Sequence, residues 1–200
     1  MHTGQMLLVI GALTLLSIVT LSVNSLIVSK TTTILQAEAY LAAISIGQSM
    51  MDEILRTQYD TATIPPKKVY PGQQSKFTPY GRLGPETGPG INEVTSVSLP
   101  EVPDTSVGYS SAIKYNDVDD YHLYRRYYYS PSLGVFTVTD SIYYVLEDNP
   151  DQVSGSQTFF KKIVVTVRHR NLAPDDLSYN EWTSPYFVQI SDIAVYRRYY

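Results

Sequence analysis

The chain has 200 residues, a formal net charge of −4 and no cysteine. The lack of cysteine excludes a disulfide framework, a thiolate metal site and a cysteine nucleophile. The acidic balance argues against a nucleic-acid-binding domain. Eighteen tyrosines against five phenylalanines favour half-buried sheets and protein–protein contacts, because tyrosine joins an apolar ring to a polar tip.

The chain opens with a long apolar segment. Residues Met6 to Val28 are interrupted only by glycine, small hydroxyl residues and Asn24, and the first Lys or Arg is Lys30. As a helix this segment is about 34 Å long, enough to cross a bilayer core of about 30 Å. A cleaved secretory signal would have a basic start and a shorter apolar run. The pattern therefore predicts a retained membrane-spanning helix.

The helix is expected to continue past the membrane length, since no proline occurs before Pro65. Beyond Lys30 the apolar residues recur at three- and four-residue spacing, which predicts an amphipathic second half; they are Leu35, Ala39, Ala42, Ala43, Ile46, Met50 and Ile54. The whole helix would cover roughly 55 to 60 residues. Residues 18–33 contain many poor helix formers, so they form either a stretched, melted segment or continuous helix.

Prolines and glycines concentrate in residues 61–110, and no apolar period survives there. This region is expected to be a mostly irregular connection, either a contact loop between subunits or a passive loop. After it, residues 121–130, 134–148, 158–170 and 186–199 are rich in β-branched and aromatic residues and read as strands. Their short connections predict an antiparallel meander.

The predicted fold class is therefore α+β. A long N-terminal helix, apolar in its first half and amphipathic in its second, would pack on a C-terminal antiparallel sheet through its Ala/Ile/Met stripe. The expected organisation is residues 1–60 as the helix (1–30 being its membrane or filament-core part), 61–110 as the loop region and 111–200 as the sheet head.

The start of the chain, "MHTGQMLLVIGALTLLSIV", resembles type IV pilins and the pseudopilins of type II secretion. "NDVDDYHLY" (116–124) and "FFKKIVVTVRH" (159–169) are more weakly similar to minor pilins of the mannose-sensitive haemagglutinin group. The resemblance implies that Met1 is the N-methylated first residue left by a prepilin peptidase. It also places Gln5 where the family keeps a glutamate that pairs with a neighbour's terminal amine, and Ser22 where it often has proline.

This resemblance implies a structural subunit of an extracellular type IV pilus-like filament, passing through the inner membrane as a single-pass precursor. Its partners would be identical subunits and a pilus assembly machinery, with Met1 and Gln5 setting the register; Gln5 is alternatively a polar residue at the membrane edge. Two further functions stay open: a minor pseudopilin of a secretion system, or a non-polymerising membrane-anchored binding protein.

Few motifs indicate chemistry. Asn116, Asp117, Asp119 and Asp120 offer oxygen ligands that suit Ca²⁺, but the EF-hand spacing is absent, so a solvated acidic turn is the preferred interpretation. The "YRRYYY" and "VYRRYY" stretches favour cation–π packing over nucleic-acid stacking. No nucleophile elbow or phosphate-binding loop occurs, so neither an enzyme nor a cofactor is expected.

Overall fold

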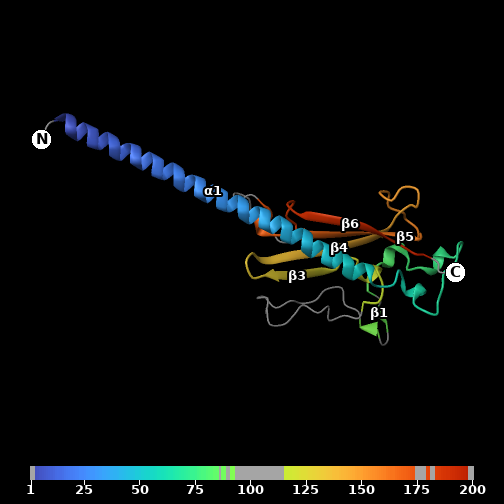
Figure 1. The fold of residues 1–200 in the computed structure, drawn as a ribbon. Helices are drawn as coiled ribbons and strands as arrows, with labels where there is room; N and C mark the ends of the chain where they lie inside the picture. Colours follow the sequence, from blue (N-terminus) through green and yellow to red (C-terminus); the bar gives the residue numbers. More distant parts are fainter. Residues whose placement is uncertain are drawn as a thin grey trace. The chain divides into compact units, whose positions relative to one another are not determined.

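A computed structural model describes residues 3–85, 87–88, 91–92, 115–173, 179–180 and 183–197, with backbone alone at 87–88 and 91–92. Helix α1 spans Thr3–Leu55, 53 residues without interruption (Figure 1). The chain divides into two compact units, Met1–Glu38 and Ala39–Tyr200. This boundary falls inside α1, because the second half of the helix shares its core with the sheet.

Hydroxyl side chains in the middle of α1 bond to carbonyls of the helix itself. Ser22 donates to the carbonyl of Ile18 at 2.9 Å, and Thr31 donates to that of Ile27 at the same distance. Thr20, Thr32 and Thr33 bond four residues back in the same way. These hydroxyls use helix carbonyls as acceptors and so need no alternative backbone conformation. Of the two alternatives for residues 18–33, the structure has the continuous helix.

Four strands form an antiparallel sheet in the order β3-β4-β5-β6. They are β3 (Arg125–Ser130), β4 (Gly134–Tyr144), β5 (Phe160–Arg168) and β6 (Val188–Val195). The registers are continuous, with Val138 opposite Val167 and Val165 opposite Ile190. The predicted meander is confirmed, and each strand is a few residues shorter than its alternating pattern.

Short elements fill the connections. The 3₁₀ turns are η1 (Thr61–Thr63), η2 (Gln74–Lys76), η3 (Tyr80–Arg82), η4 (Asp119–Tyr121) and η5 (Arg170–Leu172). Two-residue strands β1 (Thr87–Gly88) and β2 (Ile91–Asn92) pair antiparallel. Because η4 occupies residues up to Tyr121, β3 begins at Arg125 and not at residue 121 as predicted. In the turn between them, Leu123 has a backbone φ of 62°.

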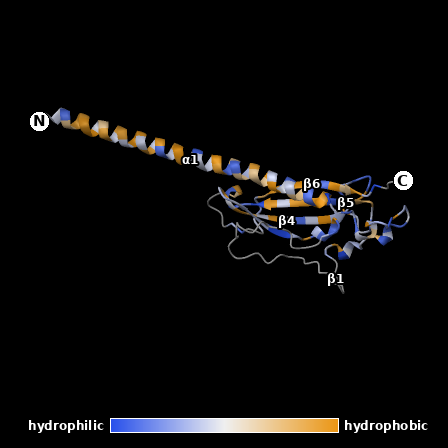
Figure 2. Cartoon of the chain, turned by 60° about the horizontal axis from the view of Figure 1, so that its bottom comes forward, coloured by the Kyte–Doolittle hydropathy of each residue, from blue (hydrophilic) through white to orange (hydrophobic). Residues whose placement is uncertain are grey.

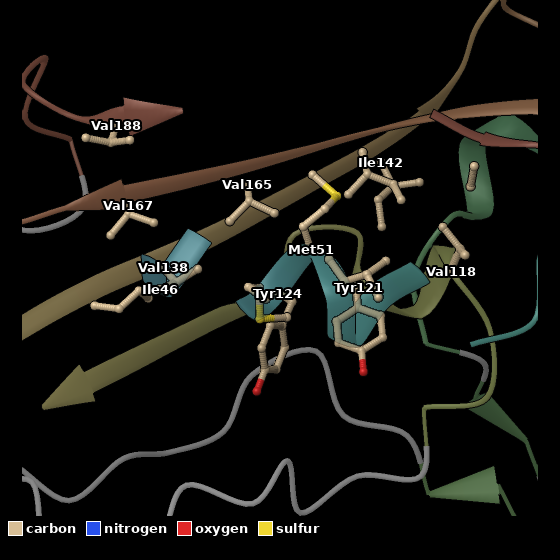
Figure 3. Packing of buried hydrophobic residues seen from close by; sticks show 14 of the residues in the cluster. Ile46, Met51, Val118, Tyr121, Tyr124, Val138, Ile142, Val165, Val167 and Val188 are labelled. Carbon is tan, nitrogen blue, oxygen red and sulfur yellow. The ribbon is translucent and has the colours of Figure 1, made fainter. Parts of the chain in front are cut away.

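The core lies between the second half of α1 and one face of the sheet. The helix buries residues at three- and four-residue spacing: Ala39, Ala43, Ile46, Gly47, Met50, Met51 and Ile54. Figure 3 shows Ile46 and Met51 packed among side chains of β4 and β5, with Tyr121 and Tyr124 beside them. The predicted α+β architecture, with the amphipathic part of the helix on an antiparallel sheet, is confirmed.

Candidate functional site

The first half of α1 exposes apolar side chains around its whole circumference. Every Met, Leu, Ile and Val from Met6 to Val28 has at least half of its surface exposed, and Figure 2 shows hydrophobic colour along this part of the helix. Within the described residues, α1 is the one helix long and apolar enough to cross a membrane. An apolar surface of this extent requires burial in lipid or protein.

The two predicted assembly residues differ in what the structure says of them. Gln5 lies in the first turns of α1 and is exposed. Met1, whose amine is its predicted partner in a neighbouring subunit, lies outside the described residues. The pairing between Gln5 and Met1 stays a prediction.

The acidic turn at residues 116–120 is buried, not solvated. Asp117, Asp119 and Asp120 are each 0% exposed. Asp117 Oδ1 accepts the backbone N–H of Asp119 at 2.9 Å, and its Oδ2 accepts the Thr61 hydroxyl at 2.6 Å. Asp120 Oδ2 accepts the backbone N–H groups of Asn116 and Asp117 at 2.7 and 3.1 Å. Carboxylates that accept such hydrogen bonds can stay buried, which is why this turn can pack inside.

These aspartates were the residues with a possible Ca²⁺-binding role. The structure gives Asp117 and Asp120 backbone and hydroxyl donors, and it gives Asp119 a lysine as partner. Among the described residues, no group of three or more His, Cys, Asp or Glu side chains is placed to hold a metal ion. The partner that distinguishes Asp119 from the other two aspartates is therefore a lysine.

That lysine is Lys161 of β5, which sequence reasoning missed. Its side chain is 0% exposed, and Nζ donates to three oxygens: the Tyr59 carbonyl at 2.7 Å, Asp60 Oδ2 at 3.0 Å and Asp119 Oδ1 at 2.5 Å. The Tyr59 and Tyr144 ring centroids lie 4.5 and 5.3 Å from Nζ. A fully buried ammonium requires such partners.

The inward position of Lys161 could have been predicted from the alternation of side chains along the strand. Side chains two residues apart on a strand face the same side, and Ile163, Val165 and Val167 are all buried. Lys161 belongs to this inward series. Its neighbour Lys162 belongs to the outward series and pairs with the exposed Asp151 at 2.6 Å. The "FFKKIVVTV" stretch therefore contains one inward and one outward lysine.

Asp60, one of the two carboxyl partners of Lys161, is held as an acceptor. Its Oδ1 accepts the backbone N–H of Ala62 at 3.0 Å, and its Oδ2 accepts that of Thr78 at 3.0 Å. The Tyr144 hydroxyl also approaches Oδ2, at 3.4 Å. These donors hold the Asp60 carboxyl group in place as a hydrogen-bond acceptor beside Lys161.

Asp119, the other carboxyl partner, is in a different environment. Among the described residues no donor reaches its Oδ2. Burial raises the pKa of Asp119 to about 8; the charge of Lys161 opposes this, while the carboxylates of Asp117 and Asp60 add to it. At neutral pH Asp119 therefore favours the protonated form.

A second polar contact joins the helix to the sheet. Arg126 Nη2 lies 2.6 Å from Glu53 Oε1, and Arg126 Nε donates to the Tyr124 hydroxyl at 3.2 Å. The Tyr121 hydroxyl donates to the same Glu53 oxygen at 3.2 Å. The Arg126 guanidinium lies 5.4 Å from the Tyr124 ring centroid. The predicted arginine–tyrosine packing is confirmed at this position.

Asp140 of β4 is the remaining buried charge-bearing side chain of the inward face. It is 1% exposed, and within the described part of the chain neither carboxyl oxygen has a hydrogen-bond partner. Burial raises its pKa well above the ordinary aspartate value, with the Arg126 charge opposing and the Glu53 charge adding. Asp140 therefore favours its protonated form.

Comparison with protein-family models, curated proteins and solved structures found no match for this chain. The features of the molecule that bear on its function are the exposed apolar half of α1 and the polar side chains around Lys161.

Proposed function

We propose that this chain is a structural subunit of an extracellular type IV pilus-like filament. One observation carries the proposal: a single helix is apolar and exposed all round from Met6 to Val28, and continues without a break into a sheet-packed half. A simple membrane anchor needs only the first part. The regular continuation favours a subunit whose helices bury one another, because the same apolar surface can leave lipid for sister helices.

In this proposal the chain first sits in the inner membrane as a single-pass precursor. An assembly machinery then moves it into the filament, where copies of residues 1–30 form the core and the sheet domains form the wall. Gln5 accepts a hydrogen bond from the Met1 amine of a neighbour. A neutral acceptor gives a weaker bond there than a carboxylate would.

The first test is composition. Filaments sheared from cells that make the chain are examined by electron microscopy and mass spectrometry, with a Met1 that carries an N-methyl group as the expected N-terminus. Filaments without the chain, or assembly that survives deletion of residues 1–30, would contradict the proposal. If each filament contained only a few copies of the chain, the chain would be a minor pseudopilin. If detergent extracted it as a monomer and no filaments were seen, it would be a membrane-anchored binding protein.

The second test addresses Gln5. Gln5→Leu removes the acceptor but keeps the helix apolar, so we expect several-fold fewer filaments per cell. Gln5→Glu should keep or raise the filament yield, because it supplies a charged acceptor. Asn24→Leu is the matched control, since it also replaces an amide of α1 by leucine. Equal yields for Gln5→Leu and Asn24→Leu would remove the register role of Gln5 and leave the composition test unaffected.

A further inference from the structure

We propose that Lys161 and Asp119 form an intramolecular isopeptide bond between Lys161 Nζ and Asp119 Cγ, with Asp60 transferring the protons. All three residues belong to the compact unit Ala39–Tyr200. The inference therefore does not depend on filament assembly, and the two can fail separately.

Position is the first argument. Lys161 Nζ lies 2.5 Å from Asp119 Oδ1, so the amine already contacts the carboxyl group that it would attack. Both side chains are 0% exposed, and Lys161 is held from β5 while Asp119 is held from η4. A reaction between two groups held in contact avoids part of the entropy cost of bringing them together.

The difference between the two carboxyl groups is the second argument. An amine condenses with a neutral carboxyl group, not with a carboxylate, and it must itself lose a proton to become nucleophilic. Asp119 supplies the neutral carboxyl, because no donor among the described residues stabilises a charge on its Oδ2. Asp60 is placed to act as the base, because its Oδ2 lies 3.0 Å from Lys161 Nζ and backbone N–H groups fix both of its oxygens.

The buried charged groups around Lys161 form a cluster whose charge balance also favours formation of the bond. Four buried aspartates belong to it, Asp60, Asp117, Asp119 and Asp120, and Lys161 is the cation bonded to two of them. Charges taken out of water destabilise the fold unless they are paired. When the amide forms, the Lys161 ammonium is consumed and Asp60 takes up its proton, so one buried pair of opposite charges is replaced by neutral groups, which favours the product in this buried place.

The reaction balances within the cluster. The Lys161 ammonium gives one proton to the Asp60 carboxylate, and the free amine attacks Asp119 Cγ. The carbon–nitrogen bond forms as one carbon–oxygen bond of Asp119 breaks. The departing oxygen leaves as water with the carboxyl proton of Asp119 and a second proton from the nitrogen. Asp60 is left protonated, and no oxidant, nucleotide or metal is consumed.

The surroundings protect the product. Tyr59 and Tyr144 lie over Nζ, and the Tyr144 side chain is 0% exposed. Exclusion of water suppresses hydrolysis of the amide and strengthens the electrostatic contacts that guide the proton. The Tyr59 carbonyl, 2.7 Å from Nζ, can accept the remaining N–H hydrogen of the amide.

The deciding experiment is mass spectrometry of the full chain. The protein is denatured, digested with trypsin and mapped. We expect a branched peptide that joins the Asp119 segment to the Lys161 segment, lighter than the two peptides together by one water, about 18 Da, with no cleavage after Lys161. Peptide mapping separates this loss from any change at the N-terminus. A wild-type chain with linear peptides and cleavage after Lys161 overturns the proposal.

Variants assign the roles. Lys161→Arg keeps the charge but lacks the nucleophilic amine, so the branched peptide should disappear completely. Lys162→Arg is the matched control in the same strand, and it should keep the bond. Asp119→Ala should abolish the bond, and Asp60→Asn should slow its formation by a factor of about 100 or more. A variant that fails to fold leaves the wild-type result decisive, and a bond formed at an unchanged rate in Asp60→Asn overturns the role of Asp60.

Discussion

Lys161 and Asp140 stand at inward positions of neighbouring strands, but only one of them has hydrogen-bond partners. The Lys161 ammonium is bonded to three oxygens, whereas the Asp140 carboxyl group has no hydrogen-bond partner among the described residues. An inward aspartate of this kind stays in a core most easily as a neutral acid. The effect of Asp140 on the unfolding free energy therefore depends on pH.

We expect Asp140→Asn to change the pH dependence of stability. Burial raises the pKa of Asp140 in the folded chain, so the folded state binds a proton more tightly than the unfolded state. The wild-type unfolding free energy should therefore fall as pH rises above about 4, the ordinary aspartate pKa. Asparagine does not titrate. The stability of the variant relative to wild type should rise by on the order of 1 kcal/mol or more from pH 4 to 7.

Denaturant titrations of both chains in detergent at pH 4, 5, 6 and 7 measure this difference. Exposed Asp192→Asn serves as the control for the loss of an aspartate carboxyl group from a strand of the same sheet. Parallel profiles for wild type and Asp140→Asn would contradict this, because they would mean that the pKa of Asp140 is the same in the folded and the unfolded chain.

At the scale of elements, Gly47 sets the approach of α1 to the sheet. A Cβ atom built on Gly47 would lie 2.8 Å from Ile190 Cδ1 and 3.4 Å from Val167 Cγ2. The helix can come this close to β5 and β6 because the residue has no side chain. Figure 3 shows the neighbouring Ile46 within the same packing region. Gly47 thus has a packing role within the core.

Leucine at Gly47 should destabilise the sheet domain. We expect Gly47→Leu to lower the unfolding free energy by about 2 kcal/mol, the usual effect of overpacking. Gly47→Ala should have a much smaller effect, because the terminal methyl of Ile190 can rotate away and alanine favours the helix by about 1 kcal/mol. Gly11→Leu is the control, since a Cβ atom added at Gly11 would have no atom within 4 Å. Chemical denaturation in detergent measures all three, and an unaffected Gly47→Leu would refute the tight approach.

The spacing of apolar residues along the sequence was sufficient to predict the helix and the strands, but not the group of polar side chains around Lys161. Alternation along 134–148 and 158–170 located β4 and β5, and the spacing from Ala39 to Ile54 located the buried helix stripe. Lys161 could have been recognised from the same alternation. Its partners could not, because Asp60 and Asp119 are 101 and 42 residues away along the chain. Their meeting depends on tertiary packing that no local pattern describes.

At the scale of the molecule, the largest apolar surface among the described residues is the first half of α1, and it is uncharged. Residues Thr3 to Ser29 of α1 carry no charged side chain and are all exposed. Assembly through this segment would depend on removal of apolar area from water and lipid, at about 25 cal/mol per Å² where water is displaced. Ion pairs would contribute little to that core.

Filaments of this chain should therefore resist salt and dissolve in detergent. We expect filament length and sedimentation to be unchanged in about 1 M NaCl, where the Debye length is only about 3 Å. A mild detergent above its critical micelle concentration should release monomers, because micelles replace the sister helices. Turbidity and negative-stain imaging measure both. Dissociation by salt alone would mean that charged contacts between the sheet domains hold the subunits together.

Residues 58 and 116–118 meet at the base of the excursion that connects helix and sheet. Gln58 donates its backbone N–H to the Asn116 carbonyl at 3.2 Å, and Val118 donates to the Gln58 carbonyl at 2.8 Å. Because the chain returns to its point of departure, the length of what lies between can change at small entropic cost, about 0.6 kcal/mol per doubling. The contacts of Gln58 with Asn116 and Val118 thus fix the helix–sheet register independently of the length of the connection between them.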